Sequence, residues 1–254
     1  MPFRADALMI PRRHFVTGRS MIAGPDLAVV AGLIGDPARA AMMSVLMSGE
    51  AYPATMLAER AGVSAQTASA HLAKLTKASL IKVMRSGRYR LYRLGNAKVG
   101  HALEALGAIS PEHQIVSLRQ SDESAALKLA RMCYDHLAGY IGVGITEALA
   151  HRSYIVPRGR DFEITKKGMK WLVAFGVESE PFEQSRRRLA TQCLDWSERR
   201  PHVGGALGAA LANRMIEQGW FTRARSNRSL KITADGGRWL LKNFGISVER
   251  QRPL

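Results

Sequence analysis

Apolar and polar positions in the first half of the chain alternate with a helical period and then with a strand period. Asp36 and Pro37 predict a helix start, because aspartate caps free amides and proline at the first helical position loses no hydrogen bond. The broad apolar stripe that follows indicates a helix through Met47. Residues 54–61 predict a second, short helix, and Gly62 supplies the tight turn that two crossing helices need.

The next predicted helix is capped by Ser64 and has two chemically different faces. Ala68, Leu72 and Leu75 share one face at helical spacing and are expected in the core. The other positions keep access to solvent and carry mainly small, amide or basic side chains: Ala65, Gln66, Thr67, Ser69 and Lys74. Such a face suits a DNA major groove, where Gln66 can pair with adenine and Thr67 or Ser69 can contact a thymine methyl group or a phosphate.

A β-hairpin is predicted after this helix. Two β-patterned runs, residues 80–84 and 89–93, flank Ser86-Gly87-Arg88, where glycine permits the turn. No Asp or Glu occurs between Glu59 and Glu104, although many Lys and Arg residues do. A carboxylate-free stretch over a helix-turn-helix pattern indicates contact with phosphates. We therefore expect three hairpin arginines to lie along phosphates or in a minor groove: Arg85, Arg88 and Arg90.

These residues resemble the ArsR family of winged-helix repressors. The resemblance covers about 80 residues and rests on the run from Val63 to Leu75 (VSAQTASAHLAKL), on Ala78-Ser79-Leu80-Ile81 and on the Arg88-Tyr89-Arg90 hairpin. It implies DNA binding as a homodimer, with residues 27–34 and 98–108 forming the dimer contact. Metal-sensing members often carry cysteines in the helix before the turn, where this chain has Ala54-Thr55-Met56-Leu57. We therefore expect no metal at that family site and no resident cofactor.

The second half of the chain repeats itself. Cys133-Tyr134-Asp135-His136 aligns with Cys193-Leu194-Asp195-Trp196, and further matched blocks end in Phe175-Gly176-Val177 and Phe244-Gly245-Ile246. Matched blocks in one order are a strong indication of a duplication. Each copy is expected to run helix, helix, hairpin and a helix capped by threonine, which is the order of a winged-helix unit.

The predicted fold class is therefore mainly α with small β-hairpin wings. We divide the chain into a flexible basic arm (1–24), a winged helix-turn-helix DNA-binding domain (25–109), a linker (110–124) and a duplicated winged-helix-like domain (125–254). The two copies in that last domain span about 125–180 and 181–248. A sensing or dimer-bracing role is inferred for the pair from its position.

The chain has two cysteines, Cys133 and Cys193, at equivalent places in the two copies. Under pseudo-symmetry they can approach each other, and with His136 and His202 they are candidates for a redox pair or a thiolate–imidazole metal site. A cysteine on an amphipathic helix is also commonly a small buried apolar residue, so a structural role stays open. The four tryptophans are expected in the core, with the lining of an apolar effector pocket as the alternative.

Composition limits the classes of function. The chain has 254 residues and a net charge of +16, which favours polyanionic partners such as nucleic acid. No uncharged apolar run has the length of a membrane span, and two cysteines are too few for a secreted disulfide scaffold. We therefore expect a cytoplasmic protein without membrane contact. No motif assembles a nucleophile with a base or an open metal position, so an enzyme is not expected.

The sequence thus predicts a homodimeric, sequence-specific regulator of transcription that binds double-stranded DNA and is a repressor released by an effector. A small molecule is one candidate effector, and a redox or metal signal through Cys133 and Cys193 is the alternative. From another class, a sequence-indifferent architectural DNA-binding protein stays open, because the charge alone would suffice for it.

Overall fold

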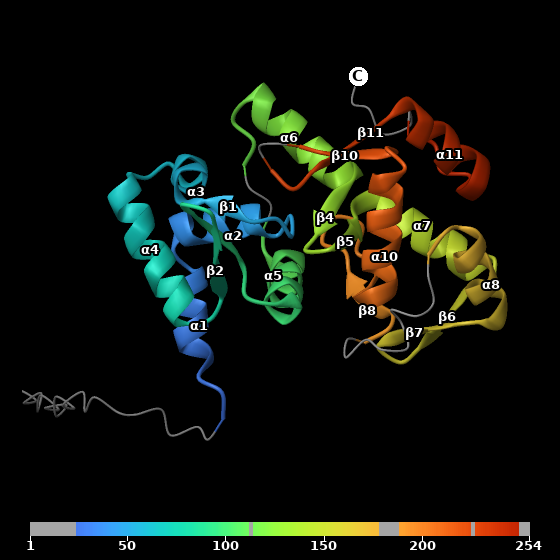
Figure 1. The fold of residues 1–254 in the computed structure, drawn as a ribbon, viewed down its shortest axis with the longest axis horizontal. Helices are drawn as coiled ribbons and strands as arrows, with labels where there is room; N and C mark the ends of the chain where they lie inside the picture. The colour runs from blue at the N-terminus through green and yellow to red at the C-terminus, as the bar shows by residue number, and fades with distance from the viewer. Residues whose placement is uncertain (1–23, 112–113, 178–187, 225–226, 249–254) are drawn as a thin grey trace, which may run out of the picture.

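The computed structural model of the chain describes residues 24–111, 114–177, 188–224 and 227–248 (Figure 1). The basic arm predicted for residues 1–24 lies outside these residues, apart from Gly24. The second half follows in Figure 1 as a separate group of helices and hairpins, with α5 between the two halves.

The first half contains the predicted helices and hairpin. Its elements are α1 (Leu27–Ile34), α2 (Pro37–Leu46), β1 (Tyr52–Pro53), α3 (Ala54–Ala61), α4 (Ala65–Lys77), β2 (Ile81–Ser86), β3 (Tyr89–Leu94) and α5 (Ala97–Ile109). The three strands form one antiparallel sheet in the order β1-β3-β2. The prediction of a winged helix-turn-helix arrangement is confirmed at this level, with element ends shifted by one or two residues.

Local chemistry sets the ends of these helices. The Asp36 side chain accepts a hydrogen bond from the Arg39 amide at 2.9 Å, and Pro37 follows it as the first helical residue. Gly62 ends α3 in the left-handed region at φ +65°, a conformation that glycine adopts without steric cost. Ser64 Oγ accepts from the Thr67 amide at 3.2 Å and begins α4.

The second half contains the same order of elements twice. The first copy holds β4 (Arg131–Cys133), β5 (His136–Ala138), α7 (Gly139–His151), β6 (Ile155–Arg158), β7 (Asp161–Ile164) and α8 (Lys166–Ala174). The second holds β8 (Thr191–Leu194), β9 (Pro201–Gly204), α10 (Gly205–Glu217), β10 (Phe221–Arg223), β11 (Leu230–Ile232) and α11 (Ala234–Phe244). The description of each copy as a winged-helix-like unit stays a prediction.

Three details differ from the sequence predictions. The fold is mixed helix and sheet rather than mainly α, because each copy opens with a β-hairpin where a helix was expected. Cys133 and Cys193 therefore lie on strands. The hairpin at Cys133 turns through Tyr134, which has φ +65°, a conformation rare for non-glycine residues. Because the turn lacks the Asn or Gly that usually marks a hairpin, the sequence did not indicate it. The predicted linker also includes the start of a helix, α6 (Leu118–Leu129).

Hairpins of the two copies pair with each other. The β6–β7 hairpin of the first copy joins the β8–β9 hairpin of the second in one sheet, where the Phe162 amide donates to the Ala190 carbonyl at 2.9 Å. At the matching place the β10–β11 hairpin lies beside β4–β5, and the Leu230 amide donates to the Ala130 carbonyl at 2.9 Å. The duplication is therefore pseudo-symmetric in its backbone contacts as well as in its sequence.

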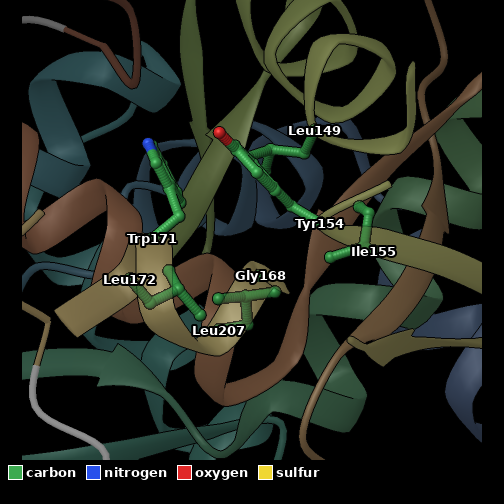
Figure 2. Close-up of a pocket in the computed structure, with 7 residues that line it drawn as sticks. All are labelled: Leu149, Tyr154, Ile155, Gly168, Trp171, Leu172 and Leu207. Carbon is green, nitrogen blue, oxygen red and sulfur yellow. The ribbon is translucent and has the colours of Figure 1, made fainter. Parts of the chain in front are cut away.

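Three of the four tryptophans form an aromatic group packed against the core of the second half. Trp220 and Trp239 stack with ring centroids 4.1 Å apart, and Trp171 stacks on Phe175 at 5.0 Å. Figure 2 shows Trp171 near Gly168 with Leu and Ile side chains around them; the gap between these residues has no room for a water molecule. These tryptophans are partly buried and pack against the apolar core, and no effector pocket forms there among the described residues.

Within the described residues, no single helix is long and apolar enough to cross a membrane. The pair α1 and α2 reaches that length and composition together, but its two helices meet at a bend of 89°.

Candidate nucleic-acid interface

Helix α4 presents the predicted DNA-contacting face to solvent. Ala68, Leu72 and Leu75 are fully buried and hold the helix against α2 and α3. The predicted contact residues of this helix and its cap are all exposed: Ser64, Gln66, Thr67, Ser69 and Lys74. In Figure 1, α4 lies at the side of the first half that faces away from the second half, so a duplex has access to it.

The β2–β3 hairpin adds a positively charged edge beside this helix. Its predicted arginines, Arg85, Arg88 and Arg90, are all exposed. Arg85 and Arg90 occupy directly opposed positions in the antiparallel register. Like charges directly opposite each other are unfavourable for a sheet, so this pair is understandable where an anion such as a phosphate binds between or beside them. Arg88 lies over the Tyr89 ring and donates to its hydroxyl at 2.9 Å.

A buried arginine anchors α4 to the preceding helices. Arg39 donates from Nε to the Leu33 carbonyl at 2.6 Å and from Nη2 to the Gly32 carbonyl at 2.9 Å. Its Nη1 lies 3.2 Å from His71 Nδ1 on α4. Arg39 therefore connects the end of α1 to α4 through hydrogen bonds. His71 therefore has a structural role on the inner side of α4.

Two helices of the first half expose apolar side chains. On α1, Leu27, Val29 and Val30 are exposed and no residue is buried. On α5, Leu106 and Ile109 are exposed, with 81% of Ile109 accessible. These are the two segments for which the family resemblance implies a dimer contact.

The four candidate sensor residues come together. Cys133, His136, Cys193 and His202 are buried, and one ligand atom from each lies within 4.8 Å of the others. The two Sγ atoms are 3.8 Å apart. Hydrogen bonding between the thiols, together with burial, raises the pKa of the Cys133 thiol, so the cluster by itself holds a protonated thiol there.

Sequence reasoning missed the charged residues that surround this cluster. Arg131, fully buried, donates to Glu104 Oε1 at 2.7 Å, lies 2.9 Å from Asp195 Oδ2 and has its guanidinium over the Trp196 ring. Arg228 reaches the other Glu104 oxygen at 2.9 Å. Burial by itself raises the pKa of Glu104, but Arg228 and Arg131 outweigh it and lower that pKa to about 2. The one available signal was that Glu104 ends the carboxylate-free stretch.

A cavity of about 620 Å³ lies between the first half and α6. Its lining is mostly apolar and includes Val45, Leu103 and Trp196; its charged members are Glu123, Lys128 and Arg228. It lies beside the exposed apolar end of α5.

Comparisons with known proteins agree with this geometry. Residues 34–83 match the family model described as a helix-turn-helix domain. The chain is 39% identical over 224 residues to the uncharacterized HTH-type transcriptional regulator YdfF of Bacillus subtilis, covering 88% of this chain and 99% of the relative.

Among solved structures, the chain is similar to NolR from Sinorhizobium fredii, with 26% identity and a TM-score of 0.31 over 33% of this chain and 82% of NolR. It is also similar to the homodimeric winged helix-turn-helix DNA-binding domain of Mb0332 from Mycobacterium bovis. That match has 20% identity and a TM-score of 0.31 over 35% of this chain and 86% of the other.

Proposed function

Because this chain belongs to the HTH-type transcriptional regulators, we propose that it is a repressor whose homodimer occupies operator DNA and excludes transcription from it. The observation that carries the proposal is the exposed face of α4 beside the arginine-rich β2–β3 hairpin. A helix of this kind fits a major groove, while a neighbouring hairpin reaches the backbone or the minor groove. We also propose a cytoplasmic location, because the proposed partner is DNA.

We assign different tasks to the two parts of this surface. Gln66 has the donor and acceptor pair that matches an adenine edge, and Thr67 and Ser69 can contact thymine methyl groups or phosphates. Ser64 caps the start of α4 and Lys74 lies in its last turn, and both side chains suit phosphate contacts. Arg85, Arg88 and Arg90 neutralise phosphates, which supplies affinity without sequence information.

The homodimer is proposed to form through α1 and α5. Both helices expose apolar side chains, with Leu27 76% and Ile109 81% accessible. Apolar residues that cluster on neighbouring elements without cover commonly mark a protein interface. A dimer would bring two copies of α4 to two half-sites of one operator.

We propose release by an effector, and the packing of the second half against the core of the DNA-binding half supports this. The cavity of about 620 Å³ is large enough for a small organic molecule, and the buried cysteine–histidine cluster is the second candidate for the signal.

The test compares two variants at a selected operator fragment and at bulk DNA. Arg88→Ala should lower the affinity for all duplexes alike, and it should reduce by about one the slope of the logarithm of the binding constant against the logarithm of the salt concentration (the salt slope). Gln66→Ala should reduce the preference for the operator. Arg158→Ala is the matched control, because Arg158 is an exposed hairpin arginine of the second half and pairs with Glu163. It should change neither property.

Two results would contradict the proposal. If the wild-type protein prefers the operator over bulk DNA by less than about a thousandfold, the architectural alternative is correct. If Arg88→Ala leaves the salt slope unchanged while Arg158→Ala lowers it, the DNA-binding surface is on the second half of the chain.

A further inference from the structure

The two cysteines and two histidines described above come from equivalent positions of the duplicated half. Cys133 and His136 are directly opposed in the β4–β5 hairpin, and Cys193 and His202 are directly opposed in the β8–β9 hairpin. Each hairpin thus contributes one sulfur and one imidazole. The pseudo-symmetric contact of the two hairpins places both pairs at one centre.

Two distances at that centre, sulfur to sulfur and nitrogen to nitrogen, match those around a tetrahedral ion. Tetrahedral bonds of about 2.3 Å to sulfur and about 2.05 Å to nitrogen place two sulfurs about 3.8 Å apart and two nitrogens about 3.3 Å apart. The Cys133 and Cys193 Sγ atoms are 3.8 Å apart, and the His136 and His202 Nε2 atoms are 3.2 Å apart.

Both imidazoles are oriented as metal-bound histidines are. Each turns Nε2 toward the centre and Nδ1 toward a carboxylate of its own copy. His136 Nδ1 is hydrogen-bonded to Asp135 Oδ1 at 3.1 Å. His202 Nδ1 lies 3.3 Å from Asp195 Oδ2, without hydrogen-bond geometry. At His136 the hydrogen-bonded carboxylate fixes the tautomer that leaves Nε2 free to ligate, and it increases the basicity of that nitrogen.

We propose that Cys133, His136, Cys193 and His202 bind one Zn²⁺ ion in a closed tetrahedral S₂N₂ site. Thiolate and imidazole donors in this geometry select zinc over the hard, oxygen-seeking cations. All four ligands are protein side chains and all are buried, so no coordination position stays open for a substrate. The ion would have a structural or regulatory role.

The position of the site connects it to the DNA-binding half. Tyr134, next to Cys133, donates its amide to the Met47 carbonyl at the end of α2 across 2.7 Å. Its hydroxyl accepts from Arg93 Nη2 on β3 at 3.3 Å. At Gly49 a Cβ atom would lie 1.9 Å from the Tyr134 carbonyl oxygen, so only glycine allows this close approach.

We therefore extend the proposal to regulation, an extension that rests on the proposed repressor function. Cys133 and Cys193 belong to the same buried cluster as Leu46, Leu72 and Leu75, which hold α2 and α4. An ion that links the two hairpins stabilises the packing behind the DNA-contacting helix. Binding that differs between two arrangements shifts their populations, and hence the affinity for DNA.

The first experiment measures metal binding without DNA. Full-length protein is reduced, stripped with a chelator and titrated with Zn²⁺ against a chromophoric chelator, and with Co²⁺ as a spectroscopic probe. We expect one ion per chain, tetrahedral d–d absorption of cobalt and a thiolate-to-cobalt charge-transfer band. Weaker absorption typical of octahedral cobalt, or the absence of the charge-transfer band, would overturn the site.

Variants locate the ion. Cys193→Ser and His202→Gln should each lower zinc affinity at least tenfold, and Cys193→Ser should weaken the charge-transfer band. His151→Gln is the control, because His151 is exposed at the end of α7, and it should bind zinc as the wild type does. Circular dichroism and the melting temperature of the metal-free variants show whether they fold. If either variant folds and keeps wild-type zinc affinity, the assignment is wrong.

The alternative occupant of this centre is a disulfide. The 3.8 Å between the sulfurs is far longer than the bond of about 2.05 Å, so oxidation would require the hairpins to move together. If thiol counting shows that the reduced protein reoxidises to a Cys133–Cys193 disulfide while taking up no Zn²⁺ beforehand, the zinc site is overturned in favour of a redox pair.

The second experiment measures DNA affinity at fixed salt with the stripped and the zinc-loaded protein. At least a fivefold difference that Cys193→Ser abolishes supports regulation. Equal affinities in the two states refute the regulatory extension while the site stands on the titration. If neither state binds any duplex, the proposed repressor function fails and the metal site is judged separately.

Discussion

Glu104 and Arg131 form a fully buried ion pair of 2.7 Å between the two halves of the chain. Glu104 lies on α5 of the DNA-binding half, and Arg131 begins the hairpin that carries Cys133. Arg228 binds the second oxygen of the same carboxylate, so Glu104 is shared by two guanidinium groups. The buried charges are thus paired, which is the condition under which burial of ions is tolerated.

Removing the charge of Glu104 should destabilise the protein strongly. Glu104→Gln leaves Arg131 buried with Asp195 as its remaining carboxylate partner, so the cost should approach but not exceed that of a buried charge left unpaired, about 3–5 kcal/mol. Chemical denaturation of both proteins measures the difference in the free energy of unfolding. The control is Glu163→Gln, which removes the exposed pair with Arg158 and should cost less than about 1 kcal/mol. Equal losses for the two variants would contradict this account.

Acid should weaken the same junction. The pKa of Glu104 falls from an ordinary 4.5 to about 2 in the folded chain, so the unfolded chain binds a proton first as the pH drops. Its stabilising contribution is complete above about pH 4.5 and is lost between that pH and about 2, an effect of about 3 kcal/mol. The free energy of unfolding of the wild type should therefore fall more steeply over this interval than that of Glu104→Gln. Parallel curves would show that Glu104 does not titrate in this way.

The hairpin arginines should separate stability from DNA affinity. Arg85 and Arg90 are opposed across the β2–β3 register, so Arg90→Ala removes a repulsion and should leave stability unchanged or higher by up to about 0.5 kcal/mol. The same variant should bind DNA more weakly and lower the salt slope by about one. Thermal melts and binding at several salt concentrations measure the two effects. A clear loss of stability would mean that Arg90 has a structural role.

Two glycines on helices should respond oppositely to alanine. At Gly208 of α10 a Cβ atom would lie 2.3 Å from the Val203 carbonyl oxygen and 2.9 Å from the Cβ of His136, so Gly208→Ala must displace the hairpins. At Gly237 of α11 the nearest atom to such a Cβ would be Val248 Cγ2 at 3.8 Å. Gly237→Ala should therefore stabilise the protein by about 1 kcal/mol through helix propensity.

Melting temperatures compare the two variants, and zinc titration of Gly208→Ala provides an additional measurement. The proposed site predicts weaker zinc binding by that variant, because His136 must move, and unchanged binding by Gly237→Ala. A stabilised Gly208→Ala protein would show that α10 and the β4–β5 hairpin are not in close contact.

The helix-turn-helix half was predictable because its signals are local. Asp36, Gly62 and Ser64 set helix ends through contacts within a few residues, and the spacing of Leu72 and Leu75 shows which face of α4 is buried. The exposure of Gln66 and its neighbours follows from that same spacing.

The duplication was also visible in the sequence, and it suggested that Cys133 and Cys193 could approach each other. It did not show that they lie on strands, because the turn at Tyr134 lacks the usual residues. The sequence also did not show that Glu104 pairs with Arg131, because these residues are 27 positions apart. Nor did it show that Asp135 and Asp195 lie beside the outer nitrogens of the two histidines, because the hairpin turns that place them there were not recognised.

The amino-acid sequence alone determined the DNA-binding module, its exposed face and the existence of two copies in the second half, because periodicity and capping act between near neighbours. Only the tertiary structure decided that hairpins of the two copies pair with each other and that two sulfurs and two imidazoles lie at one buried centre. That arrangement depends on contacts between hairpins about 60 residues apart, which local preferences do not encode.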